Sequence, residues 1–187
     1  MRERPSWNTP WSVTRALSVR YGGTNFVPPS ALERGTLVHE WTAETDQSLT
    51  PVETPKGLEG YCKAYKEFIH TMRPIWLKVE SPVEHEPLGY HGILDRLGWI
   101  NGDIHQYCVA DIKTGMPGKK DRYQLAAYAM AVEPEKYRDM KRIGIYIRPN
   151  GQWSLREYDD PLDYQTWMDI LNEANETKES HGARRNP

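Results

Sequence analysis

The chain has 187 residues, of which 38% are hydrophobic, and its seven tryptophans and eleven tyrosines can supply the core of one domain. Its net charge of −2 and pI near 6.3 differ from the basic balance of proteins that coat nucleic acid non-specifically. The sequence has neither the ~18 consecutive apolar residues of a membrane span nor the apolar run of ~7–15 residues that a secretory signal needs. We therefore expect a cytoplasmic protein.

Composition divides the chain into three parts. Residues 1–30 are rich in Pro, Trp, Ser and Gly, and we expect an arm that packs on a domain. Residues 31–174 carry the regular apolar patterns and are predicted to form that single domain, whereas the polar tail 175–187 is predicted to be flexible. Cys62 and Cys108 lie inside the predicted domain and, without an export signal, are expected to be reduced and buried.

Apolar residues at steps of three and four predict the helices. The segment that begins at Ser30, a plausible N-cap, carries His39. The clearest periodicity precedes Pro74, which should end its helix. The predicted helices span residues 12–19, 30–45, 58–72, 120–132 and 161–174.

Alternation of apolar and polar residues predicts the strands. Between the second and third strands, Asn101, Gly102 and Asp103 have the composition of a hairpin turn. The predicted strands span residues 75–80, 88–100, 104–114, 142–148 and 152–158. This order of elements predicts an α/β fold, in which helices flank a mixed central sheet.

Two acids and a lysine on the predicted hairpin are the candidates for chemistry. Asp111 and Lys113 are two residues apart on one strand, so their side chains leave the same face of the sheet. Asp95 and Asp111 share a face only if an odd number of residues closes the turn or a bulge shifts it. We therefore predict a three-residue turn or a bulge that places Asp95 opposite Val109 and diagonal to Asp111, where one metal ion can bridge the two acids.

This constellation is typical of phosphodiester hydrolysis assisted by a divalent metal, because bound metal acidifies water and neutralises phosphate charge. Oxygen ligands, without a cluster of cysteines and histidines, favour Mg²⁺ or Mn²⁺ over zinc. Lys113 is predicted to position the attacking hydroxide and to stabilise the pentacovalent phosphate.

Four short blocks occur in order between residues 34 and 128. They read RGTLVH from Arg34, GILDR from Gly92, DIKTG from Asp111 and QLAAY from Gln124. Their order, on a predicted helix, strand, strand and helix, resembles the PD-(D/E)XK nuclease superfamily, particularly its RecB-like branch of phage and bacterial exonucleases. The resemblance implies a restriction-endonuclease-like core and metal-dependent exonuclease activity on DNA.

The resemblance also implies roles for individual residues. Asp111 would be the central metal ligand, and Lys113 would be the catalytic lysine, acting with Asp95. The implied ligands are His39, Asp95, Asp111 and the backbone carbonyl of Ile112, with Glu80 on the preceding strand as a further candidate. The implied cofactor is Mg²⁺ or Mn²⁺, and no iron-sulfur cluster is expected because two cysteines cannot supply its four ligands.

Contact with DNA is predicted near the fourth block. The resemblance implies that Gln124 and Tyr128 contact DNA phosphates or brace the site, although two residues four apart could also be one face of an amphipathic helix. Lys119, Lys120 and Arg122 could be an ordinary exposed cluster, but we favour DNA contact because they lie where a DNA backbone would pass the metal.

The resemblance leaves two alternatives open. The same fold could cut DNA internally, as a structure-specific endonuclease or nickase, or it could be a catalytically silent nucleic-acid-binding module. The intact acids and lysine favour an enzyme. DNA is the expected partner, and because no helicase motif is present, any motor would be another protein of recombination or repair; a homo-oligomer fits the sequence, and a membrane partner is not expected.

Overall fold

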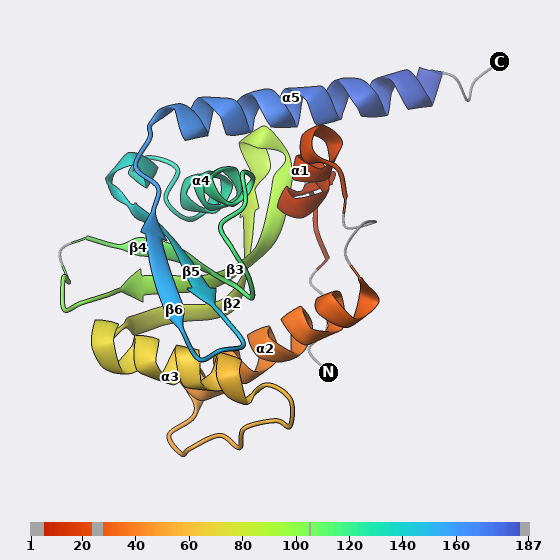
Figure 1. Ribbon diagram of the computed structural model, residues 1–187. Helices are drawn as coiled ribbons and strands as arrows, with labels where there is room; N and C mark the ends of the chain where they lie inside the picture. The colour runs from red at the N-terminus through yellow and green to blue at the C-terminus, as the bar shows by residue number, and fades with distance from the viewer. Residues whose placement is uncertain (1–5, 24–27, 105, 184–187) are drawn as a thin grey trace.

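The computed structural model describes residues 6–23, 28–104 and 106–183 (Figure 1). After a two-residue strand, three helices come first, followed by three strands, one helix, two strands and a final helix. The helices are α1 (Val13–Tyr21), α2 (Pro29–Gln47), α3 (Glu59–Met72), α4 (Asp121–Val132) and α5 (Leu162–Ala183), with short 3-10 turns at Glu86–Leu88 and Tyr137–Asp139. The strands are β1 (Trp11–Ser12), β2 (Ile75–His85), β3 (Tyr90–Trp99), β4 (Cys108–Lys113), β5 (Lys141–Ile147) and β6 (Trp153–Glu157).

The strands form one mixed sheet in the order β1, β3, β4, β5, β6, and β2 pairs with β3. β3 is antiparallel to β2 and β4, whereas β4 and β5 run parallel, joined by a crossover through α4. α2 and α3 lie on one side of the sheet, and α1, α4 and α5 lie on the other (Figure 1). The predicted α/β fold, with a mixed sheet flanked by helices, is confirmed.

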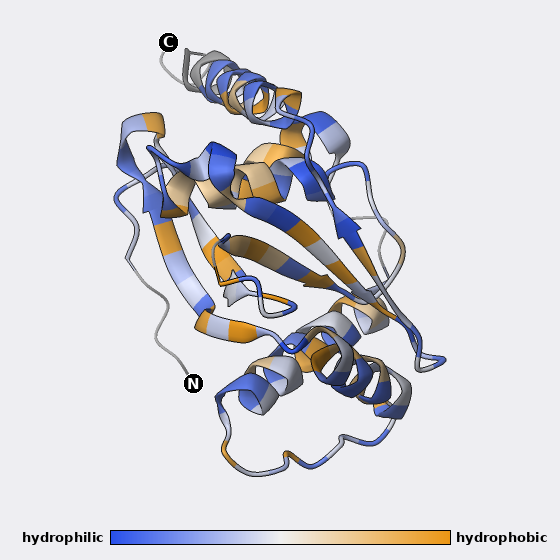
Figure 2. Ribbon diagram, turned by 90° about the vertical axis from the view of Figure 1, so that its left-hand side faces the viewer, coloured by the Kyte–Doolittle hydropathy of each residue, from blue (hydrophilic) through white to orange (hydrophobic). Residues whose placement is uncertain are grey.

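Two apolar clusters bury the two faces of the sheet. On one face Ile112, Ile143 and Ile145 pack with Tyr65 and Phe68 of α3. On the other face Leu94, Leu97 and Val109 pack with α4 and α5 residues such as Leu125 and Trp167. Hydrophobic residues are concentrated where the helices meet the sheet (Figure 2). Because side chains alternate along a strand, odd-numbered residues of β4 such as Val109 face α4 and α5, whereas even-numbered residues such as Ile112 face α3.

The beginning of α2 corrects a prediction. Its N-cap is Pro28, and Pro29 occupies the first turn, so the predicted N-cap at Ser30 is wrong. Proline suits the first helical position because its ring fixes φ near the helical value and its missing N–H would be unpaired there. No side chain caps this end of α2.

The β3–β4 register also corrects a prediction. Leu97 is opposite Val109 and Arg96 is opposite Ala110, so Asp95 is not opposite Val109. The connection is not a three-residue turn, because β4 begins only at Cys108, and Asn101 and Gly102 both adopt positive φ within the longer loop. The register still pairs residues of equal parity, so Asp95 and Asp111 share a face as expected.

Strand β2 and helix α5 are both longer than the sequence patterns indicate. β2 continues to His85, with a register shift between Trp76 and Lys78, and its Ile75 and Leu77 are about half exposed rather than on a buried face. α5 continues to Ala183, nine residues beyond the predicted end at Ala174, through a segment with few apolar residues to reveal its period. No helix of the described residues is both long and apolar enough to cross a membrane.

Candidate active site

Asp95 and Asp111 meet where β3 and β4 run side by side. The register that pairs Arg96 with Ala110, continued by one residue, places Asp95 opposite Asp111. Both carboxylates are buried, with 6% and 2% of each residue exposed. Asp95 Oδ2 accepts a hydrogen bond of 2.7 Å from the backbone N–H of Ile112, so the Asp95 carboxylate is fixed on the neighbouring strand.

His39 and Glu80 complete a cluster of ligand types around Asp95. His39 Nδ1 lies 3.5 Å from Asp95 Oδ2 and 3.8 Å from Glu80 Oε1. One ligand atom from each of these three residues lies within 4.8 Å of the others, and no other such group occurs in the described residues. α2, β2 and β3, which are far apart in sequence, thus bring an imidazole and two carboxylates together.

Glu80 occupies an unusual backbone conformation. Its φ of 47° lies in the left-handed region, which non-glycine residues rarely adopt. Such a conformation costs on the order of 1–3 kcal/mol and persists where the surroundings hold it. In this chain Arg96 Nη1 donates to Glu80 Oε1 at 3.0 Å, on the side of the carboxylate that faces His39. The left-handed turn thus occurs at a ligand candidate of the cluster.

Asp111 lies beside this cluster and is held by α4 and by its own strand. Gln124 Nε2 donates to Asp111 Oδ1 at 2.8 Å, and Lys113 Nζ lies 2.8 Å from Asp111 Oδ2. Lys113 Nζ also donates to Gln124 Oε1 at 3.1 Å. Asp111, Lys113 and Gln124 therefore form a closed triangle, and the Asp111 oxygens are engaged by these partners rather than grouped with His39, Glu80 and Asp95.

Arg96 is a member of the site that sequence reasoning missed. Its side chain is fully buried and donates to Asp46 Oδ2 at 2.6 Å as well as to Glu80. It also donates to Thr42 Oγ1 and to the backbone carbonyl of Asp95. Its place next to Asp95 in the GILDR block was the available signal, but Asp46 and Thr42 come from a helix about fifty residues away.

A cleft of about 1210 Å³ opens along α2 onto this cluster. His39, Glu80, Ile93 and Thr114 are among its lining residues. Gly35 of the RGTLVH block lies beside the residue that follows β4, since a Cβ there would be in ordinary van der Waals contact, at 3.9 Å, with Thr114 Oγ1. His39 and Glu80 of the cluster therefore face this cleft.

Tyr128 lies inside the protein. Only 2% of it is exposed, and its ring packs against Gly92, where an added Cβ would lie 2.7 Å from Tyr128 Cε1. This contact explains why the GILDR block begins with glycine. Of the two roles predicted for Tyr128, its burial supports bracing of the site. Gln124, also buried, binds Asp111 and Lys113 as described above.

The three cations predicted to contact DNA differ in their surroundings. Lys119 and Lys120 are exposed just before α4. Arg122 instead points toward the beginning of α5, where it pairs with Asp160 at 2.8 Å and with Asp163. The structure thus brings Lys119 and Lys120 to the surface and engages Arg122 in ion pairs.

Burial and nearby carboxylates shift the proton affinities of the site. Burial disfavours the imidazolium of His39, but Asp95, Glu80 and Asp111 outweigh it and raise the pKa of His39 to about 9. Burial raises the pKa of Asp111 to about 7, against the opposing effect of Lys113. Burial also opposes the charge of Lys113, yet Asp111 and Asp95 hold its pKa above the ordinary value. Lys113 is therefore a cation at neutral pH.

The donor set fits a divalent cation. Two carboxylates supply hard oxygen ligands, which Mg²⁺ and Mn²⁺ prefer, and the imidazole of His39 is better suited to Mn²⁺ than to Mg²⁺. His39, Glu80 and Asp95 would hold the ion. Asp111 stays a predicted ligand, since its carboxylate borders this group on the neighbouring strand.

Comparisons with known proteins carry no argument about the function of this chain. No protein-family model and no curated protein matches this sequence. Among solved structures, the chain is similar to SSO0001, with 19% identity, a TM-score of 0.48 and coverage of 94% of this chain and 78% of that one. It is also similar to an alkaline exonuclease from Laribacter hongkongensis, with 15% identity, a TM-score of 0.42 and 93% of each chain covered. We therefore base the function on the side chains of the site.

Proposed function

We propose that this protein is a metal-dependent deoxyribonuclease of the PD-(D/E)XK type, in its RecB-like branch, and that it acts as an exonuclease. The observation that carries the proposal is the meeting of His39, Glu80 and Asp95 beside the triangle of Asp111, Lys113 and Gln124. A surface ion pair would need neither the burial of Asp95 and Asp111 nor three converging ligand side chains. The cleft along α2 would give a DNA strand access to this site.

Each part of the site has a distinct role in the proposed reaction. A divalent ion held by His39, Glu80 and Asp95 would acidify water and neutralise charge on the phosphate. Lys113, kept cationic by Asp111 and Asp95, would contact a phosphate oxygen and stabilise the charge that develops there. Gln124 positions the Lys113 ammonium and the Asp111 carboxylate by bonding to both.

We further infer that the protein acts in recombination or repair, with any motor supplied by a partner protein. The test uses end-labelled linear DNA and covalently closed circular DNA, each incubated with Mg²⁺, Mn²⁺ or EDTA. The proposal expects metal-dependent loss of linear DNA only, abolished in Asp111→Ala and Lys113→Ala. Cutting of circles would replace the exonuclease with an endonuclease, and binding without cleavage would replace the enzyme with a binding module.

A further inference from the structure

Arg148 follows β5 at the sheet edge that carries Lys113. β4 and β5 are parallel, and Lys113 is the register partner of Tyr146, so Arg148 lies two residues further along the neighbouring strand. With strands ~4.8 Å apart and ~3.3 Å per residue, the Cα atoms of Lys113 and Arg148 are roughly 8 Å apart. Arg148 therefore lies alongside the segment that follows Lys113.

The side chains of Arg148 and Lys113 project from the same face of the sheet. Tyr146, two residues earlier, donates its hydroxyl hydrogen to Asp121 at the beginning of α4, and Lys113 bonds to Gln124 of the same helix. Arg148 Nη2 donates to Ser154 Oγ at 3.3 Å, and Ser154 is the register partner of Tyr146. All of these side chains thus point toward the α4 side.

The Arg148 guanidinium lacks a counter-charge. No carboxylate of the described residues lies within 4.0 Å of it, and its Nε is buried with no hydrogen-bond partner among them. A guanidinium offers five N–H donors, and Arg148 uses one of them, in the bond to Ser154. By contrast, Arg96, Arg122 and Arg142 each pair with a carboxylate. Arg148 is thus an unsatisfied donor beside the proposed site.

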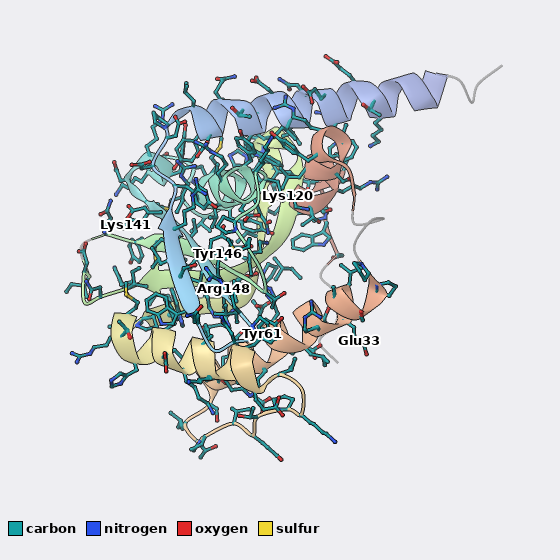
Figure 3. All side chains as sticks on the ribbon, in the orientation of Figure 1. Glu33, Tyr61, Lys120, Lys141, Tyr146 and Arg148 are labelled. Carbon is teal, nitrogen blue, oxygen red and sulfur yellow. The ribbon has the colours of Figure 1, made fainter. Side chains whose placement is uncertain are left out.

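Further cations continue from Arg148 across this face. Arg156 is exposed on β6 and is the register partner of Gly144, which places it on the same face as Tyr146. Lys120 lies at the beginning of α4, next to the Asp121 that bonds Tyr146 (Figure 3). We call Lys119, Lys120, Arg148 and Arg156 the cationic strip. Within the described ranges, no carboxylate lies within 4.0 Å of the charged group of any member of the strip.

We propose that Arg148 is a substrate-binding residue that holds a backbone phosphate of DNA next to the phosphate contacted by Lys113. This inference rests on the proposed nuclease function. The planar guanidinium can donate two parallel hydrogen bonds to one phosphate, and a partly dry setting strengthens them. The DNA strand that leaves the site would then pass Lys119, Lys120 and Arg156. These residues would add positive charge without a fixed hydrogen-bond geometry.

The test compares Arg148→Gln with Arg138→Gln, which removes the same charge beyond the opposite end of β5. DNA binding is measured by fluorescence anisotropy in EDTA over a range of salt concentrations, and cleavage is measured with Mn²⁺. Arg148→Gln should weaken binding at least tenfold, reduce the log–log salt slope by about 0.9, and raise KM more than it lowers kcat. Arg138→Gln should match the wild type within about twofold.

Conservative variants keep the test decisive. Arg148→Lys should retain the salt slope but recover only part of the affinity, because an ammonium cannot bond bidentately. If Arg148→Gln fails to fold by thermal unfolding, a several-fold higher KM in Arg148→Lys supports the proposal and an unchanged KM overturns it. Equal salt slopes and KM for the two glutamine variants would also overturn it. Absence of any cleavage by the wild type would instead overturn the proposed nuclease function.

Discussion

Two buried arginines of the same sheet have opposite surroundings. Arg142 on β5 donates to Asp163 Oδ2 at 2.7 Å and to the backbone carbonyl of Asp160 at 2.8 Å. Its guanidinium also lies 4.5 Å from the ring centre of Tyr164. These partners all belong to α5 or to the residues just before it, so the Arg142 network fastens α5 to the sheet and contains no residue of the cleft.

The Arg96 network instead ends in the cleft. Arg96 joins Asp46 and Thr42 of α2 to Glu80, whose side chain is 23% exposed beside His39. Asp46 also accepts a hydrogen bond of 2.6 Å from the Tyr65 hydroxyl. The comparison teaches that a charge network that only joins a helix to the sheet serves stability, whereas one that includes a carboxylate of the cleft can position a ligand.

Removal of the Arg142 charge tests the first half of this comparison. In Arg142→Gln, Asp163 keeps a buried charge with one partner fewer, and we expect the free energy of unfolding to fall by about 3–5 kcal/mol. Urea unfolding measures this change. Cleavage per folded molecule, assayed at a temperature where the variant is folded, should match the wild type. A loss of cleavage with unchanged stability would contradict the structural role.

Replacement of the Arg96 guanidinium by an ammonium tests the second half of this comparison, the role of the Arg96 network in positioning a metal ligand. In Arg96→Lys the charge is kept, but a single ammonium cannot replace the separate guanidinium nitrogens that bond Asp46, Thr42 and Glu80. We expect the apparent affinity for Mn²⁺ to fall tenfold to a hundredfold, as is usual when a group that orients a ligand is lost. Titration of DNA cleavage against Mn²⁺ measures this affinity. The matched control is Arg142→Lys, and equal affinities in the two lysine variants would remove the distinction between the networks.

The proton affinity of His39 predicts how the stability of the protein depends on pH. In the metal-free protein its pKa of about 9 exceeds the ordinary ~6.5, so its stabilising contribution is full below pH 6.5 and is lost as the pH rises through about 9. The raised pKa of Asp111 also makes stability fall as the pH rises, but this contribution is lost near pH 7. Between pH 7 and pH 9.5 in EDTA, the wild type should therefore lose roughly 2–3 kcal/mol more unfolding free energy than His39→Gln.

Denaturant unfolding at the two pH values measures this difference. Bound Mn²⁺ requires the neutral imidazole, so its stabilising effect on the wild type should grow as the pH rises over the same range. Equal pH dependence of the wild type and His39→Gln in EDTA would show that the carboxylates around His39 do not hold its proton.

Much of the fold was predictable because it depends on local patterns. The apolar periodicity before Pro74 gave α3 almost residue for residue, and strand parity correctly put Asp95 and Asp111 on one face. The partner of Asp95 was predicted wrongly because parity fixes the face but not the length of the loop after Trp99. That loop holds two consecutive residues with positive φ and delays β4 to Cys108.

The surroundings of the site were less predictable, because they depend on contacts between distant segments. Arg96 follows Asp95 in the sequence and could be read as half of a surface ion pair, yet it is fully buried against Asp46. Arg122 looked like a free cation next to Lys120, and only the position of α5 reveals its acidic partners. Neither contact leaves a periodic signal in the sequence.

The most direct test of the central claim is the rate of cleavage of end-labelled linear DNA as a function of Mn²⁺ concentration, for the wild type and Lys113→Met. The account predicts that the wild-type rate rises with Mn²⁺ and saturates, is abolished by EDTA, and falls on the order of 10²–10³-fold in Lys113→Met. A wild-type rate that persists in EDTA, or a Lys113→Met rate equal to that of the wild type, would contradict it.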